Sequence, residues 1–420
     1  MQKSSSSFWV SFCAGIIISS ELLLYFVYHI GFSLHIGRVL QLFFVPLFLI
    51  VIIKSGPITL THKTKQAVML VILWCIYEVL VYSFSIFFDI DALFNFKHLI
   101  LFFYQIIIFV FLPLFLIRNH HSFFIFVKTI RVVLWISVIV GFIDLIGSFF
   151  EIDLVARHIS DGRNVGKRFH GLFGEPRDAA VSISFLLVIE AIWGALNERK
   201  LIFVDKKIIF LFFCLFYTFS FSMITGLIIF LLFWLFLPFK KNLKNFFLLL
   251  LIILFFFYAI FSFSNRLKLY LDDFINILWI VYYFDYQNVP MVFLGQMPNL
   301  VPISGFLERL KTFSPLALFG SGIGSVIISN IKSGLFMSET VTSFSNISRF
   351  LIEKGVLGMM LYIYTHLKIF NKTVINFDSK LIIYTLMVLG FSMSLAHRSP
   401  ISFILLGISI VMINLYKNEN

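Results

Sequence analysis

Arginine is the residue type with the clearest chemical potential in the polar parts of this apolar chain. Its planar, permanently charged guanidinium group donates paired hydrogen bonds to carboxylate or phosphate oxygens. Two long polar segments, about 150–178 and about 264–349, carry it repeatedly, as Arg157, Arg163, Arg168, Arg177, Arg266, Arg309 and Arg349. This pattern indicates a clamp for a diphosphate. The ordinary alternative is pairing with nearby carboxylates or with lipid headgroups.

Candidate acid–base groups lie in or beside the same two segments. The stretch RFHGLFGEPRDAA, residues 168–180, contains His170 and Glu175, and Glu353 lies just beyond the second segment. Histidine titrates near neutral pH, and a carboxylate can accept a proton from a hydroxyl, so each is a candidate general base. The structural alternatives are a solvated loop position for His170 and a favourable charge at a helix N-terminus for Glu175.

Two glycines recur at a fixed distance from an arginine. Ten residues separate Arg163 from Gly174, and ten separate Arg309 from Gly320. Glycine lets the backbone approach a ligand closely, so GSGIG, residues 320–324, forms either a binding loop or an ordinary turn. The sequence has no nucleotide phosphate loop, dinucleotide fingerprint, serine-nucleophile elbow or metal-ligand spacing. We therefore expect chemistry without a metal or a cofactor.

The elements that position these residues are predicted to be membrane helices. The 420 residues are 60% hydrophobic and 13% charged, include 57 Phe, and have a mean hydropathy of +0.99. A soluble domain cannot bury that much apolar surface. Most lysines behind the net charge of +12 lie in short segments between apolar runs. They indicate membrane orientation and lipid contact, not nucleic-acid binding. The three cysteines lie in apolar runs and predict no disulfide.

We expect an all-α polytopic membrane protein, one integral domain over residues 1–420, with about twelve transmembrane helices. Apolar runs of roughly 17–25 residues suit a hydrocarbon core of ~30 Å. The predicted spans lie near 8–30, 38–53, 66–88, 98–117, 122–149, 179–196, 207–222, 225–238, 246–263, 350–370, 381–396 and 401–416. The seventh and eighth could instead be two short helices joined by a tight turn. Lysines gather in alternate short connectors, which places both termini in the cytoplasm and the two long segments outside it.

The chain resembles the O-antigen polymerases of Wzy type and, more distantly, the O-antigen ligases. RFHGLFGEPRDAA is similar to that family's Arg–Gly–Leu–Phe–x–Glu–Pro segment, and the two Arg–Gly spacings resemble its paired loop motifs. ALFGSGIGS, residues 317–325, and SNISRFLIEKGVLG, residues 345–358, resemble the second loop's Gly-x-Gly and its return to the membrane. The stretch TVTSFSNIS lacks the His that ligases usually carry there, which favours a polymerase.

The resemblance implies a reaction of lipopolysaccharide biosynthesis at the outer face of the bacterial inner membrane. A glycan on undecaprenyl diphosphate is transferred to a hydroxyl of a new lipid-linked repeat unit, and the diphosphate lipid leaves. The implied substrate-binding residues are Arg163, Arg168, Arg309, Arg177, Arg349, Gly174 and Gly320, and the implied catalytic residues are Glu175, His170 and Glu353. The implied partners are the lipid-linked oligosaccharide, membrane lipids and a chain-length regulator protein, without nucleic acid.

Other classes of membrane protein fit parts of the sequence. A ligase would transfer the glycan to lipid A core. A lipid-linked oligosaccharide transporter or flippase would use ionisable groups within apolar spans, where charge is costly. The candidates for that role are Glu21, Glu78, Asp144 and Glu190. A structural scaffold is the third alternative, and the clustered arginines argue against it.

Overall fold

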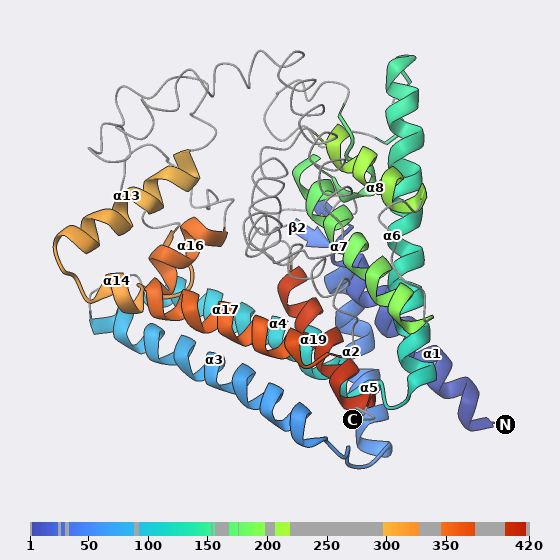
Figure 1. The fold of residues 1–420 in the computed structure, drawn as a ribbon, viewed down its shortest axis with the longest axis horizontal. Coiled ribbons are helices and arrows are strands. Elements are labelled where there is room, and N and C mark those ends of the chain that lie inside the picture. Colours follow the sequence, from blue (N-terminus) through green and yellow to red (C-terminus); the bar gives the residue numbers. More distant parts are fainter. Residues whose placement is uncertain are drawn as a thin grey trace, which may run out of the picture. The chain divides into compact units, whose positions relative to one another are not determined.

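The computed structural model describes residues 2–23, 27–29, 33–87, 92–152, 154–155, 168–174, 176–197, 206–218, 297–326, 346–373 and 400–416. Within these ranges the regular structure is helical apart from one antiparallel hairpin, β1 (Val27–His29) with β2 (Ser33–His35) (Figure 1). The predicted helical class is confirmed. The hairpin, which occupies part of a connector and the end of the first predicted span, was not expected.

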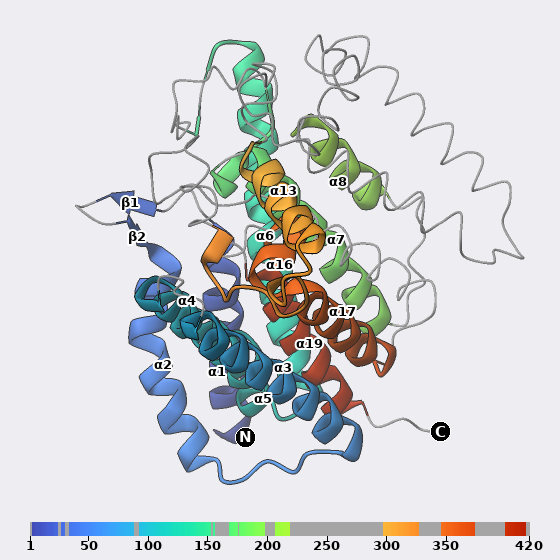
Figure 2. The ribbon, with the colours of Figure 1, turned by 90° about the vertical axis from the view of Figure 1, so that its left-hand side faces the viewer.

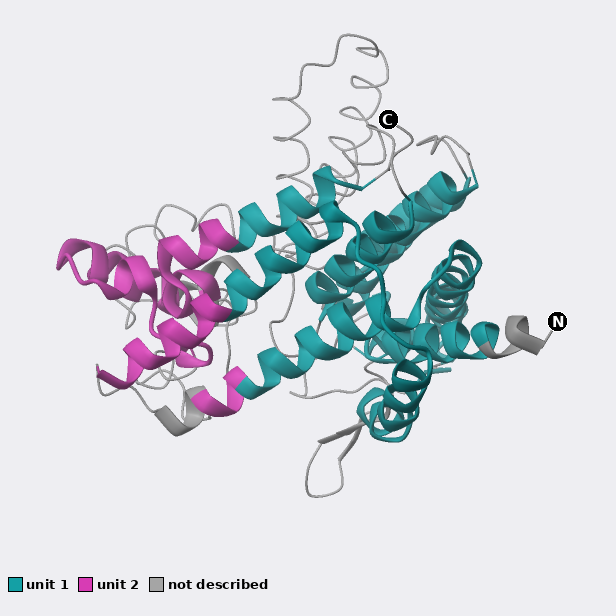
Figure 3. Cartoon of the chain, turned by 90° about the horizontal axis from the view of Figure 1, so that it is seen from below, with its two compact units in different colours: residues 1–75, 100–227, 362–420 teal, residues 76–99, 228–361 magenta. Residues whose placement is uncertain are grey.

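The chain divides into two compact units (Figure 3). Unit 1 contains residues 1–75, 100–227 and 362–420, and unit 2 contains residues 76–99 and 228–361. The helices that begin in the first half of the chain are α1 (Gln2–Ser20), α2 (Ile36–Lys54), α3 (His62–Phe87), α4 (Ala92–Gln105), the π-helical η2 (Ile106–Phe111), α5 (Leu112–Leu116), α6 (His120–Phe149), the 3-10 turn η3 (Gly171–Phe173), α7 (Pro176–Leu196) and α8 (Lys206–Tyr217). The later helices are α13 (Met297–Lys311), α14 (Leu316–Phe319), α16 (Asn346–Glu353), α17 (Gly355–Asn371) and α19 (Ile401–Leu415).

Five helices are long and apolar enough to cross a membrane. They are Gly37–Lys54, His62–Phe87, Phe96–Leu116, His120–Phe149 and Asp178–Leu196. They coincide with the predicted spans 38–53, 66–88, 98–117, 122–149 and 179–196, because each is an unbroken apolar run of sufficient length. The span predicted at 401–416 is confirmed as an apolar helix, α19. The protein is therefore a helical membrane protein.

Three predicted spans differ from the structure. The first, 8–30, ends as a helix at Ser20, where the hydroxyls of Ser19 and Ser20 donate to the carbonyls of Gly15 and Ile17. The span at 207–222 is the shorter α8, and the span at 350–370 is two helices, α16 and α17. The spans predicted at 225–238, 246–263 and 381–396 lie outside the described residues.

Unit 1 is organised around the long helix α6. Asn119 caps its N-terminus by accepting a hydrogen bond from the Ser122 N–H at 2.8 Å. Helix α1 approaches it closely at Gly15, where an added Cβ would lie 2.7 Å from Thr129. Helix α7 runs beside it (Figures 1 and 2). Elsewhere in unit 1, Trp74 is buried among the rings of Phe102, Tyr362 and Phe403.

Unit 2 contains the second polar segment. Its described part has a small apolar core of Phe306, Ala317, Val326 and Ile352, against which Leu351 and Val356 pack. These residues come from α13, α14, α16 and the start of α17, together with the loop after α14. The core therefore joins the two stretches whose motifs the sequence analysis singled out, 317–325 and 345–358.

Candidate functional site

The two motif stretches of unit 2 run against each other at the end of α16. The Ser321 N–H donates to the Ile352 carbonyl, and the Gly322 N–H donates to the Glu353 carbonyl, both at 2.9 Å. Gly320 has a φ of +80°, and an added Cβ would lie 2.3 Å from the Glu353 carbonyl oxygen. Gly355 has a φ of +62°, and its added Cβ would lie 2.3 Å from the Leu318 carbonyl oxygen. Only glycine fits both positions.

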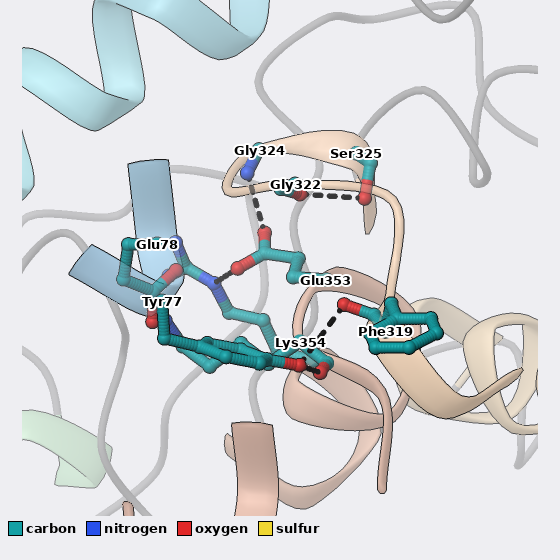
Figure 4. Close-up of polar contacts among 9 residues, drawn as sticks. Tyr77, Glu78, Phe319, Gly322, Gly324, Ser325, Glu353 and Lys354 are labelled. Carbon is teal, nitrogen blue, oxygen red and sulfur yellow. Dashed lines mark hydrogen bonds and ion pairs between the residues drawn. The ribbon is translucent and has the colours of Figure 1, made fainter. Parts of the chain in front are cut away.

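Glu353 lies at the centre of this crossing and is fully buried. Its Oε1 accepts a hydrogen bond from the Gly324 N–H at 2.8 Å, and its Oε2 accepts one from Arg349 Nε at 2.6 Å (Figure 4). A buried carboxylate needs such partners, since burying an unpaired charge is very costly. The GSGIG turn therefore cradles Glu353. This arrangement makes Glu353 a positioning group for Arg349.

Arg349 retains hydrogen-bonding capacity in this buried setting. Its side chain is 5% exposed, and its Nε lies 2.6 Å from Glu353 Oε2. Its buried Nη1 has no hydrogen-bond partner among the described residues. A buried donor without a partner costs free energy. The role of Arg349 as a substrate clamp stays a prediction, and this unsatisfied donor is the observation that supports it.

Arg309 approaches the same turn from α13. Its Nη1 donates to the Ile352 carbonyl oxygen at 3.1 Å, so it supports the end of α16. Burial lowers the pKa of Arg309 to about 10, against the opposing effect of Glu308. The guanidinium therefore stays charged at neutral pH. Arg309, Gly320, Arg349 and Glu353, four of the predicted site residues, are brought together in this part of unit 2.

Two residues of α3 hold the break between α16 and α17. Tyr77 Oη lies 2.7 Å from the Lys354 carbonyl oxygen and 3.2 Å from that of Phe319. Glu78 pairs with Lys354 Nζ, and both side chains are buried (Figure 4). From the sequence, Glu78 was a candidate for transport, and no role was predicted for Tyr77 or Lys354. The available signal was that a charge within an apolar span requires a partner, although the sequence did not show which cation supplied it.

The described residues of the first polar segment contact α6 and α8 in unit 1. His170 is 2% exposed, and its Nε2 lies 3.3 Å from Asp144 Oδ2 on α6. Asp144 Oδ1 also accepts hydrogen bonds from the N–H groups of Leu154 and Val155. The alternative of a solvated loop position for His170 is therefore wrong, because the imidazole is buried in an internal pair. This pair fastens the segment to the helix.

Other predicted residues of the first segment are placed in part. Arg168 Nε donates to the Thr218 carbonyl at 2.8 Å, next to the end of α8. Gly174 has a φ of +88° at the end of the η3 turn. Arg177 is in the first turn of α7, but its side chain is outside the described part of the structure, and so are Arg163 and Glu175. The predicted roles of these residues stay predictions.

The carboxylates considered for transport have protein partners. Glu21 accepts from Gln41 Nε2 at 3.2 Å and lies 3.7 Å from Arg38 Nε. Glu190 Oε1 accepts from Arg131 Nε and from Trp135 Nε1, each at 2.5 Å. Asp144 and Glu78 have the partners described above. Side chains of the chain itself thus accompany each of the four charges.

The fold and the site define the class as a helical membrane protein with a buried Arg–Glu pair at a glycine-rich turn. Among the described residues, no three or more His, Cys, Asp or Glu side chains are grouped to hold a metal ion. No protein-family model matches the chain, and no curated protein shows significant similarity to it. The assignment of a reaction therefore depends on the sequence motifs and on the geometry of unit 2.

Proposed function

We propose that the protein is a glycosyltransferase of the O-antigen polymerase class, acting on undecaprenyl-diphosphate-linked repeat units at the outer face of a bacterial inner membrane. One observation carries the proposal. The two motif stretches of the second loop converge on Arg349, whose Nη1 is buried and has no partner among the described residues. An arginine with a free face in a buried site suits the oxygens of a diphosphate.

The proposed reaction exchanges one bond at the anomeric carbon of the growing glycan. The bond from this carbon to the diphosphate oxygen breaks, and a bond to the acceptor hydroxyl oxygen forms. The electron pair leaves with undecaprenyl diphosphate, and the hydroxyl proton passes to a base. Arg349 stabilises the negative charge that develops on the leaving diphosphate, and Glu353 fixes the guanidinium in place before the reaction begins.

The base is proposed to be Glu175. His170 and Glu353 are both held in internal pairs, with Asp144 and Arg349 respectively, which supports positioning roles for them. The proposal keeps twelve spans, cytoplasmic termini and a chain-length regulator as features implied by the resemblance. A diphosphate leaving group makes nucleotide sugars and ATP unnecessary, and arginine is proposed to stabilise its charge in place of a metal.

The test is the surface-glycan profile of cells that lack the protein, complemented with wild type, Arg349→Lys or Arg38→Lys. Arg38 lies 3.7 Å from Glu21, and its side chain is 47% exposed, which makes it a matched control. We expect single repeat units in the deletion and a ladder restored by wild type and by the control. Arg349→Lys loses the guanidinium fork, so polymerisation should fall on the order of a hundredfold.

Two other profiles would contradict polymerisation. Long polymer stranded on the lipid carrier in the deletion would identify a ligase. Loss of all surface glycan, including the single unit, would point to ligation or export.

A further inference from the structure

The turn that follows α13 places a phenylalanine where a helix usually ends with glycine. The Ser314 N–H donates to the Arg309 carbonyl at 2.9 Å, and the Phe313 N–H donates to the Leu310 carbonyl at 3.2 Å. This pair of bonds is the Schellman pattern, whose left-handed position favours glycine. Phe313 occupies that position with a φ of +51°. A bulky residue in this conformation is strained.

The side chain of Phe313 gains little from packing inside the protein that could offset this backbone strain. Phe313 is 93% exposed, and the apolar side chains of Leu310 and Leu318 beside it are 44% and 48% exposed. In a turn that faces water, glycine would relieve the backbone strain, and a polar residue would avoid exposing an apolar side chain. The exposed group of Leu310, Phe313 and Leu318 is called the apolar turn below. Its composition indicates a partner outside the chain that favours apolar groups.

The neighbourhood of the apolar turn indicates that the partner is lipid. Helix α14 follows directly, and its Phe319 stacks on Phe84 of α3 with ring centroids 5.6 Å apart. Figure 1 shows α14 at the end of α3, which is a candidate membrane span. Phe84 lies one turn before the last residue of α3, and Phe87 there is 85% exposed. The apolar turn thus continues the exposed apolar surface of the end of a span.

The length of α3 sets the expected depth of this surface. Its 26 residues correspond to about 39 Å, against a hydrocarbon core of ~30 Å, so its ends reach the headgroup region. Exposed Lys311 lies two residues before Phe313. A basic residue next to exposed Phe and Leu is the composition of segments that lie in the membrane interface. The cation can remain among the headgroups while the ring enters the acyl region.

We propose that the apolar turn is a membrane anchor, which inserts Phe313 at the boundary between lipid headgroups and acyl chains. Lipid contact then offsets the unfavourable backbone conformation of Phe313. Because Arg309 of the same helix supports the end of α16, the anchor also fixes the height of the Arg349–Glu353 site relative to the bilayer. The inference is independent of the proposed reaction, since it needs only a membrane-embedded chain.

The experiment measures how deeply a fluorescent label lies when attached at position 313. In the full chain with Cys13, Cys75 and Cys214 replaced, Phe313→Cys is labelled with a small fluorophore and reconstituted in phosphatidylethanolamine–phosphatidylglycerol vesicles. Quenching is measured with iodide in the water and with lipids brominated on their acyl chains. Glu308→Cys, an exposed site on α13, is the aqueous control, and Leu80→Cys, 59% exposed on α3, is the lipid control.

We expect brominated lipid to quench the label at 313 as it does at 80, and iodide to quench it far less than at 308. Iodide quenching equal to that at 308 would overturn the anchor. A label that neither quencher reaches would show that protein covers the turn, from this chain or a second copy, and would also overturn it.

A second variant tests the role of the ring itself. Phe313→Gly fits the left-handed backbone, so the fold should be retained. A label at the neighbouring Thr312→Cys should then become about twofold more accessible to iodide, because the anchor is lost. Unchanged accessibility at 312 would contradict a role for Phe313 in insertion.

Discussion

At the scale of single residues, the site depends on how Glu353 uses its two oxygens. Its Oε1 accepts a hydrogen bond from the Gly324 N–H, and its Oε2 accepts one from Arg349 Nε. The carboxylate therefore joins the glycine-rich turn to the helix that carries the arginine. Both charged side chains are almost completely buried. The pair therefore fixes the guanidinium group, whose Nη1 has no hydrogen-bond partner among the described residues.

Removing the charge of Glu353 should destabilise unit 2. In Glu353→Gln the buried Arg349 loses its counter-charge, which typically costs about 3–5 kcal/mol of the free energy of unfolding. Denaturation of the purified protein in detergent measures the change. The matched control is Glu308→Gln, an exposed glutamate of α13, which should change stability by no more than about 0.5 kcal/mol. Equal stability of the two variants would refute the role given to Glu353.

The backbone crossing at Gly320 makes a separate prediction. Gly320→Ala adds a Cβ 2.3 Å from the Glu353 carbonyl oxygen at a φ of +80°. Gly56→Ala provides the control, because Gly56 has a φ of +72° with nothing within 4 Å of the added Cβ. The control should cost about 1 kcal/mol through backbone strain alone, and Gly320→Ala clearly more. If thermal unfolding in detergent finds similar losses, the crossing is not a tight constraint.

At the scale of elements, the important feature is the break between α16 and α17. Helix α16 ends at Glu353, Lys354 forms the turn, and Gly355 begins α17 with a φ of +62°. Helix α3 supports the break through Tyr77, which reaches the Lys354 carbonyl, and through Glu78, which pairs with the Lys354 ammonium group. A residue far away in sequence thus holds the segment that carries Arg349 and Glu353.

This support predicts a non-additive set of variants. Glu78→Gln leaves the Lys354 charge buried without its counter-charge, and Lys354→Met does the same to Glu78; each should cost about 3–5 kcal/mol. The double variant Glu78→Gln with Lys354→Met removes both charges, so it should be less destabilising than the sum of the single changes. Denaturation of all four proteins under the same conditions measures the coupling. Simple additivity would show that the two side chains do not interact.

The sequence predicted the elements better than it predicted their ends and contacts. Five predicted spans match helices of the structure because the length of an apolar run is enough to identify them. The break at Lys354 was missed because one span was predicted over residues 350–370, across the charged Glu353 and Lys354. The left-handed backbone at Gly355 depends on the crossing with Leu318, which the sequence does not show. The end of α1 at Ser20 was missed because a further apolar stretch, residues 22–28, follows it in the sequence.

The residues of the candidate site were also predictable in part, but their contacts were not. Arg309, Gly320, Arg349 and Glu353 were selected by type and motif, and the structure brings them together. Their specific partners were not predictable, because hydrogen bonds between segments arise only from the folded chain. Tyr77 lies in no motif, and Lys354 occupies a variable position of the stretch 345–358. The solvated alternative for His170 failed because the side chain is buried against Asp144.

At the scale of the whole molecule, a helical membrane protein is proposed to catalyse a reaction between two lipid-linked substrates. The buried Arg349 pairs with Glu353 through its Nε, and its Nη1 has no hydrogen-bond partner among the described residues. That donor is the observation that supports the proposed chemistry at the second loop. Bond formation between repeat units is therefore the decisive test of the proposed function.

The most direct measurement uses the purified full chain in vesicles, supplied with lipid-linked repeat units extracted from cells that lack it. Without nucleotide and with a metal chelator present, we predict oligomers of the repeat unit, with one undecaprenyl diphosphate released for each bond formed. Arg349→Lys should slow the release on the order of a hundredfold. If the units stay single with the purified protein while wild-type membranes extend the same extract, the protein is not the polymerase.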